Sequence, residues 1–168
     1  ICSVPHDPAI WVHTWWDLGM RNATAIWFTQ DVGREVHVID HCEILGGGLP
    51  DAAKELDRRK YRYAGHHAPH DARVRELGTG KSRIETAAAL GIEFKENDMV
   101  PNIGIEDGIQ AARLFFPRCW FDRDKTARGR DALASYHRSY DAKRKIYSAQ
   151  HVHDWSSDSA DGFRYLAV

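Results

Sequence analysis

The sequence predicts an α/β domain in which a mixed sheet of five or more strands is flanked by helices. Three apolar, β-branched segments come first and are joined by short polar links. Segments with strand-like and helix-like patterns then alternate along the chain. The chain has 168 residues, of which 43% are hydrophobic and 28% charged, which fits one soluble domain with a single substantial core.

The first three strands are expected over residues 10–16, 23–29 and 35–44. Each segment is rich in aromatic and β-branched residues, and the third alternates apolar with polar side chains. The links over residues 19–22 and 31–33 are short and contain glycine. Short links of this kind favour antiparallel pairing, so the sequence predicts a β-meander.

A helix over residues 49–60 should follow, because Pro50 stands near its start and apolar residues share one face. Residues 61–66 are expected to form a fourth strand, with Asp71 just beyond its end. A right-handed crossover allows this strand to lie beside the first one. Asp17, which closes the first strand, would then be a neighbour of Asp71.

The second half of the chain contains shorter patterns. Ser82 and Glu85 have the spacing of a capping box, and Gly91 is suited to end the helix that the box begins. The expected elements are a helix over residues 83–90, a strand over 92–95, a helix over 105–116, a longer helix over 124–140, a polar connection without an element over 141–154, and a last helix from Ser157.

Four acidic residues are candidate metal ligands. Asp17 follows two tryptophans in an apolar strand, where a carboxylate must be desolvated or paired. Asp158 and Asp161 share one face of the last helix and repel each other unless a positive charge lies nearby, although an ordinary acidic first turn is an alternative. With Asp71, these residues offer the carboxylate oxygens that Mg²⁺ or Mn²⁺ prefers.

Composition excludes several classes of protein. The three cysteines lack a C-x-x-C pair, so neither a disulfide framework nor a cysteine zinc site is indicated. No apolar run approaches the ~20 residues that cross a bilayer, so no membrane partner is expected. The net charge of −1 gives no strong field for attracting nucleic acid. Residues 1–9 are expected to be a linker from a preceding region, and residues 10–168 to be the domain.

The segment G-T-G-K-S over residues 78–82 has the end of a phosphate-binding P-loop but not its beginning. The pattern requires a glycine where this chain has Arg75, and an apolar strand where it has a charged run. We therefore expect no nucleotide site in this chain. Lys81 and Arg83 are instead candidates for contacts with DNA phosphates near the metal site.

Ten histidines are a high number for this length, yet no H-E-x-x-H motif accompanies them. A zinc site is therefore disfavoured. His70, next to Asp71, is a candidate for a contact with a metal-bound group or for orienting water.

Four motifs in the same order resemble the nuclease domain of tailed-phage terminase large subunits. They are D-L-G at residues 17–19, P-H-D-A at 69–72, G-T-G-K-S-R at 78–83 and D-W-S-S-D-S-A-D-G-F-R-Y at 154–165. The resemblance runs from about Trp11 to the end. It implies an RNase H-like fold and a metal-dependent endonuclease that cuts concatemeric double-stranded DNA at the start and end of packaging.

The same resemblance assigns metal binding to Asp17, Asp71 and Asp161, with help from Asp158. Two Mg²⁺ or Mn²⁺ ions would be bridged by Asp17, one activating water and the other stabilising the departing 3′-oxygen. The implied partners are double-stranded DNA, an ATPase motor domain of the same polypeptide, the portal and the small terminase subunit. The implied location is the host bacterial cytoplasm, on the viral procapsid.

This chain departs from the family pattern at two positions. Relatives usually carry His where it has Asp158, and Ala where it has Gly162. The sequence also leaves other classes open: another RNase H-like nuclease, such as a junction resolvase or integrase-like core, or a non-catalytic module that docks DNA or a motor. The motif contexts around Asp71 and Arg83 favour the terminase interpretation over these.

Overall fold

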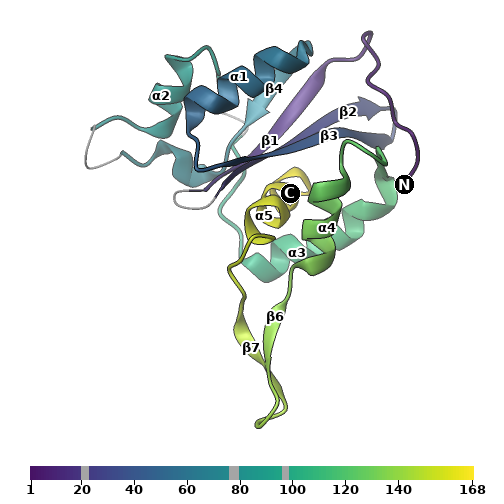
Figure 1. Cartoon of the computed structure of the whole chain (residues 1–168), viewed down its shortest axis with the longest axis vertical. Coiled ribbons are helices and arrows are strands. Elements are labelled where there is room, and N and C mark those ends of the chain that lie inside the picture. The colour runs from purple at the N-terminus through teal and green to yellow at the C-terminus, as the bar shows by residue number, and fades with distance from the viewer. Residues whose placement is uncertain (20–22, 76–79, 96–98) are drawn as a thin grey trace.

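The computed structural model describes residues 1–19, 23–75, 80–95 and 99–168. Its centre is a five-stranded sheet in the order β4-β1-β2-β3-β5 (Figure 1). The first three strands pair antiparallel, whereas β4 runs parallel to β1 and β5 runs parallel to β3. The strands are β1 (Val12–Leu18), β2 (Ala23–Val32), β3 (Glu35–Leu45), β4 (Tyr63–His67) and β5 (Cys119–Phe121). The predicted mixed sheet is confirmed.

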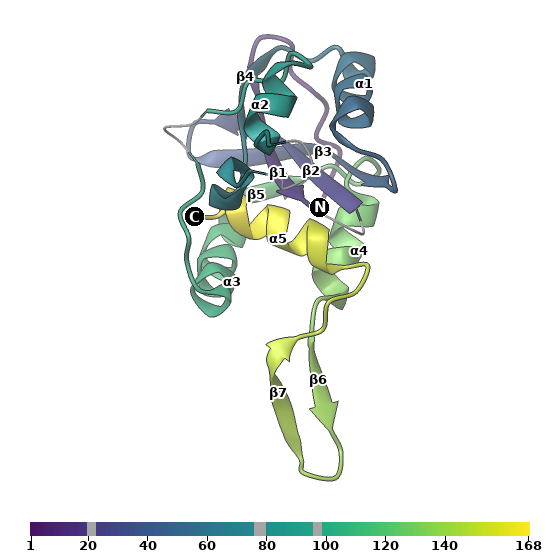
Figure 2. The same ribbon diagram turned by 90° about the vertical axis from the view of Figure 1, so that its left-hand side faces the viewer.

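Helices cover both faces of the sheet, as the two views in Figures 1 and 2 show. One face is covered by α1 (Leu49–Arg59) and α2 (Arg83–Ala88). The other face is covered by α3 (Ile105–Phe115), α4 (Ala127–Ser135) and α5 (Ser157–Leu166). In the part of the chain that the structure describes, no helix is long and apolar enough to cross a membrane.

The central strand β2 is buried on both sides, which explains its nearly continuous apolar sequence. Ile26 and Phe28 belong to the core beneath α1 and α2. Trp27 points to the opposite side and packs with Phe163 of α5. This two-residue alternation applies to β1 as well: Trp16 joins the first core, and Asp17 lies on the side that faces α5.

Two predicted elements in the second half are wrong. Residues 92–95, expected to be a strand, form one isolated bridge between Phe94 and His66. The fifth strand is β5, which has three residues and follows a 3₁₀ turn that contains Pro117. A strand this short shows no alternation, so its sequence gives no signal. The helix predicted over residues 124–140 ends at Ser135.

A β-hairpin occupies the region where we expected the end of that helix and then a connection without an element. Its strands are β6 (Arg138–Asp141) and β7 (Ile146–His151). Tyr140 is the last residue of the predicted helix, and it instead pairs with Tyr147 across the hairpin. Both strands are largely exposed, so neither carries the apolar alternation of a half-buried strand.

The remaining elements agree with the sequence to within three residues, including α1, the capping box at Ser82 and the last helix. The first nine residues, expected to be a linker, are partly packed against the domain. Cys2 forms a β-bridge with Asp122, and the buried Val4 donates its N–H to the Asp122 carboxylate at 2.9 Å. This segment therefore extends the packed structure.

Candidate metal centre of acidic residues

Asp17 lies near the end of β1, on the side of the sheet that faces α5. Its neighbour across the strand pair is Ala25. Gly162 of α5 lies directly above: a Cβ atom there would be 3.5 Å from the Asp17 nitrogen and 3.3 Å from the Trp27 ring. The small residue at this helix position therefore lets α5 approach the acid-bearing strand closely.

Helix α5 presents two further acids to the same region. Asp158 is 4% exposed, and its Oδ2 accepts the backbone N–H of Ala23 at 3.1 Å. Asp161 is one turn further along, and its Oδ1 accepts a hydrogen bond from Arg164 at 3.1 Å. Both acids are thus held by the protein itself, one by the start of β2 and the other by a residue of its own helix.

The acids disfavour one another's charge. Burial raises the pKa of Asp17 well above its usual value, and the negative charges of Asp161, Asp158 and Asp71 add to this rise. Burial is also the main reason why the pKa values of Asp158 and Asp161 are raised. Arg164 opposes the effect at Asp17 and Asp161 but does not cancel it. A bound cation would supply the missing positive charge.

Asp71 lies in a 3₁₀ turn (His70–Arg73) that follows β4. Because β4 pairs with β1, this turn is brought to the Asp17 end of the sheet, and the charge of Asp71 acts on Asp17. The two acids therefore lie at the same end of the sheet, within range of each other's charge. Asp71 and the adjacent His70 are both exposed to solvent.

The donor set fits a hard divalent cation, because it consists of carboxylates, of which Asp161 is paired with Arg164. The charges of Asp158 and Asp161 act on Asp17, and the charge of the solvent-exposed Asp71 acts on it more weakly. Across residues 1–19, 23–75, 80–95 and 99–168, however, no three acidic, histidine or cysteine side chains are grouped closely enough to hold an ion. Coordination of an ion by three of these acids therefore requires side-chain movement. The Asp161 carboxylate would then contact both Arg164 and the ion.

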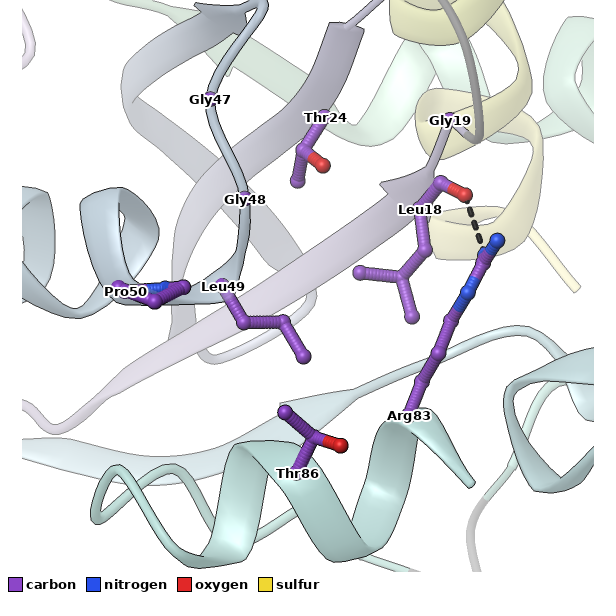
Figure 3. A pocket seen from close by; sticks show the side chains of 9 residues that line it. All are labelled: Leu18, Gly19, Thr24, Gly47, Gly48, Leu49, Pro50, Arg83 and Thr86. Carbon is purple, nitrogen blue, oxygen red and sulfur yellow. Dashed lines mark hydrogen bonds between the residues drawn. The ribbon is translucent and has the colours of Figure 1, made fainter. Parts of the chain in front are cut away.

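Arg83 reaches the acid-bearing strand from α2. Its Nη1 donates to the Leu18 carbonyl at 2.5 Å, next to Asp17 (Figure 3). The side chain borders a pocket of about 310 Å³ between β1, α2 and the start of α1. Ser82 forms the predicted capping box with Glu85, and the neighbouring Lys81 is exposed. Residues 78 and 79 of the same motif lie outside the described residues.

The buried histidines bond within the sheet. The Nδ1 of His66 lies 2.7 Å from the Thr14 hydroxyl, and the Nε2 of His67 lies 3.0 Å from the Nδ1 of His13. His67 also stacks on Trp15, with ring centroids 4.1 Å apart. These contacts join β4 to β1, and they account for the pair of histidines without a zinc site.

Ser159, between the two acids of α5, anchors the helix through residues that the sequence analysis missed. Its hydroxyl donates to Glu43 at 2.7 Å and lies 2.9 Å from Nε2 of His41. Because the single hydroxyl proton goes to the carboxylate, His41 must be the donor in the second bond. Burial lowers the pKa of His41 to about 3, so the ring is neutral and its Nε2 carries the proton. Trp27 also donates to the Ser159 carbonyl at 2.8 Å.

Arg164 and Tyr165 are two further residues of the site that the sequence analysis missed. Arg164 is 7% exposed and lies over the Tyr165 ring, 5.0 Å from its centroid. Burial raises the pKa of the Tyr165 hydroxyl, and the charges of Asp17 and Asp161 raise it further. The available signal was helical spacing, since these residues follow Asp161 by three and four positions.

Comparison with known proteins identifies the fold. The chain matches no protein-family model and no curated protein sequence. It is similar in structure to the P22 large terminase nuclease domain, with 17% identity and a TM-score of 0.70 over 98% of this chain and 84% of that one. The nuclease domain of the SPP1 large terminase with bound Mn gives 14% identity and a TM-score of 0.61 over 92% and 84% of the two chains.

The large terminase of a thermophilic bacteriophage in complex with ADP is also similar, with 16% identity and a TM-score of 0.69. The match covers 99% of this chain but 41% of that longer terminase. The chain thus spans less than half the length of the thermophilic phage protein. Its mixed sheet, flanking helices and acid-bearing β1 and α5 therefore have the fold of the nuclease domains of large terminases.

Proposed function

We propose that this chain is the metal-dependent endonuclease domain of a DNA-packaging terminase large subunit, and that it hydrolyses phosphodiester bonds in concatemeric double-stranded DNA. One observation supports this most strongly: on a terminase nuclease fold, Asp17 of β1 and Asp158 and Asp161 of α5 interact through their charges with raised pKa values, and the ion pair of Asp161 with Arg164 does not cancel the rise. A site of this kind favours binding of cations.

Asp17, Asp71, Asp158 and Asp161 would hold two Mg²⁺ or Mn²⁺ ions. When bound, such ions stabilise the attacking and the leaving oxygen of a phosphodiester. The chain's own contribution is to hold the backbone that carries these acids and to engage two of them through hydrogen bonds, from which they would rotate toward the ions. The Ala23 N–H orients one oxygen of Asp158, and Arg164 orients Asp161.

DNA and protein partners complete the proposal. Arg83 and Lys81 would contact phosphates beside the acids, and His70 would orient water or a metal-bound group. The motor domain would belong to the same polypeptide. In support, the match covers only 41% of the thermophilic phage terminase, and the structure of that terminase is a complex with ADP. The portal and the small terminase subunit are the further proposed partners, on a procapsid in the host bacterial cytoplasm.

Metal-dependent nicking of a supercoiled plasmid tests this proposal. The chain should convert supercoiled to relaxed and linear DNA with Mn²⁺ or Mg²⁺, and EDTA should stop the reaction. Asp161→Asn should lose this activity because it removes a ligand charge, whereas Asp57→Asn, which changes an exposed acid on α1, should keep it.

Circular dichroism should show that both variants remain folded. A wild-type chain that binds DNA but does not nick it with either metal would favour a docking module. Nicking that survives Asp161→Asn would assign the activity to other residues or to a contaminant.

A further inference from the structure

The hairpin of β6 and β7 is set apart from the rest of the domain. The two strands form a sheet of their own, separate from the five-stranded sheet. Figures 1 and 2 both show it extending away from the helical layer of α3, α4 and α5. Strand β7 has six residues, and at ~3.3 Å per residue it extends about 20 Å. The turn at residues 142–145 thus lies well away from the body of the domain.

Aromatic and apolar side chains are exposed on this hairpin. Tyr140 is 53% exposed, Tyr147 67% and Ile146 53%. The two tyrosine rings pair across the strands with centroids 5.0 Å apart. An isolated two-stranded ribbon gains little stability from such exposed groups, which leaves them available to contact a partner.

The turn of the hairpin is basic, in contrast to the chain as a whole. The whole hairpin, residues 138–151, contains four basic residues and one acidic residue, and three of the basic residues lie in the turn. The full chain, by contrast, has a net charge of −1. The acidic residue, Asp141, shapes the turn: its Oδ1 accepts the N–H groups of Lys143 and Arg144 at 2.9 and 3.0 Å. Lys143, Arg144 and Lys145 are all exposed. The Nε of Arg144 also lies 3.8 Å from Oδ2 of Asp141, so the turn carries a net positive charge, mainly from the two lysines.

The base of the hairpin leads directly to the acidic centre. His151 stacks on Tyr136 with centroids 4.8 Å apart and planes at 4°, and Arg138 pairs with Glu106 at the start of α3. A pocket of about 480 Å³ lies between this base and α5, and Asp161 lines it. After β7 the chain enters α5, which carries both helical acids. A partner lying along the hairpin would thus extend to the pocket that Asp161 lines.

We infer that the β6–β7 hairpin binds duplex DNA beside the phosphate that is cut, with Lys143, Arg144 and Lys145 on backbone phosphates and the two tyrosines against a groove. This inference rests on the proposed function. A two-stranded ribbon fits the major groove, and exposed basic side chains match the charge of phosphates. A protein partner would be expected to cover an apolar face, but here charged residues adjoin the tyrosines at the turn.

The test is a triple variant that removes the charge of the turn: Lys143→Ala, Arg144→Ala and Lys145→Asn. Asparagine is chosen because residue 145 has φ 55° in the left-handed region, which Asn tolerates. The control triple removes charge elsewhere on the surface through Arg34→Ala, Lys54→Ala and Arg58→Ala. A second control, Lys143→Arg with Lys145→Arg, keeps the charge of the turn.

Steady-state cleavage of a linear duplex with Mn²⁺ should show a KM raised about tenfold or more in the turn triple, with kcat within about twofold of wild type, since the tip lies about 20 Å from the base. The dependence of log binding constant on log salt should become less steep by about 2 to 3, because each lost phosphate contact removes ~0.9. The control triple and the arginine variant should match wild type.

An unchanged KM and salt slope in a folded turn triple would overturn the inference while leaving the proposed function intact. If the turn triple and the control triple lose the same amount of DNA affinity, the inference is also overturned, because the loss would then reflect only the net charge of the protein. Unchanged DNA binding combined with lost self-association would assign the surface to a protein contact. If wild type itself fails to cleave, the proposed function fails; DNA binding then still tests the hairpin, by the salt slope alone.

Discussion

Replacing Asp17 with asparagine should lower metal-dependent DNA cleavage by at least about a thousandfold. The amide has the shape of the carboxylate but lacks its charge, and metal ions supply several kcal/mol of transition-state stabilisation, equivalent to about three powers of ten in rate. The negative charges of the other three acids all raise the pKa of Asp17. Single-turnover cleavage of a labelled duplex with Mn²⁺ measures the effect.

The same substitution should stabilise the chain when no divalent metal is added. Because the folded-state pKa of Asp17 is raised, the folded chain holds this proton to higher pH than the unfolded chain does. Stability from this group is therefore greatest below the unfolded pKa near 4 and is lost as pH rises through the folded value. Asp17→Asn removes that loss, so its melting temperature should exceed that of wild type at pH 8.

Added metal should give wild type a higher melting temperature than Asp17→Asn, the reverse of the order without metal. Mn²⁺ at 100 times its dissociation constant would stabilise wild type by about 2.7 kcal/mol, and Asp17→Asn should gain much less. Thermal melts at pH 5 and pH 8, with and without Mn²⁺, measure both effects. The exposed Asp57→Asn serves as the control that should follow wild type throughout. A metal response equal to wild type in Asp17→Asn would place the ion elsewhere.

Trp27→Ala should cost about 3–5 kcal/mol in the free energy of unfolding. Trp27 is fully buried, and its indole N–H donates to the Ser159 carbonyl at 2.8 Å. Helix α4 packs closely on the ring: a Cβ at Gly129 would be 2.4 Å from it. The substitution therefore opens a cavity between the sheet, α4 and α5, and it also removes a bond that positions the segment between Asp158 and Asp161.

Urea denaturation followed by circular dichroism measures this cost, with Trp27→Phe as the matched variant. Phenylalanine retains most of the ring but not the N–H, so its cost should be smaller. Because domains of this kind are stable by only about 5–15 kcal/mol, this cost is a large fraction of the total, and the urea midpoint of the alanine variant should fall clearly below that of wild type. A loss below about 1 kcal/mol in the alanine variant would show that the ring does not organise this face of the sheet.

The sheet was predictable because its strands carry their own signals. Strand β2 is apolar on both faces, and β1 and β3 are joined to it by short links. The hairpin was not predictable in this way, because exposed strands lack apolar alternation and Tyr140 happens to lie at helical spacing from Tyr136. Strand β5 was missed since three residues are too few to show a period.

The site was predictable only in part. The proximity of Asp17 and Asp71 follows from sheet topology, and that of Asp158 and Asp161 from helical spacing. The residues that hold α5 in place do not follow from either rule. Ser159 contacts Glu43 across 116 positions of sequence, and a contact at that separation depends on how α5 packs on the sheet.

Anomalous diffraction from a crystal soaked in Mn²⁺ with a short DNA duplex would show whether these acids bind metal. Mn²⁺ density is expected in contact with Asp17 and with at least one carboxylate of α5, and the side chains should be rotated from their present positions. Manganese density confined to other sites, with Asp17 and Asp161 no closer than in this structure, would contradict this expectation.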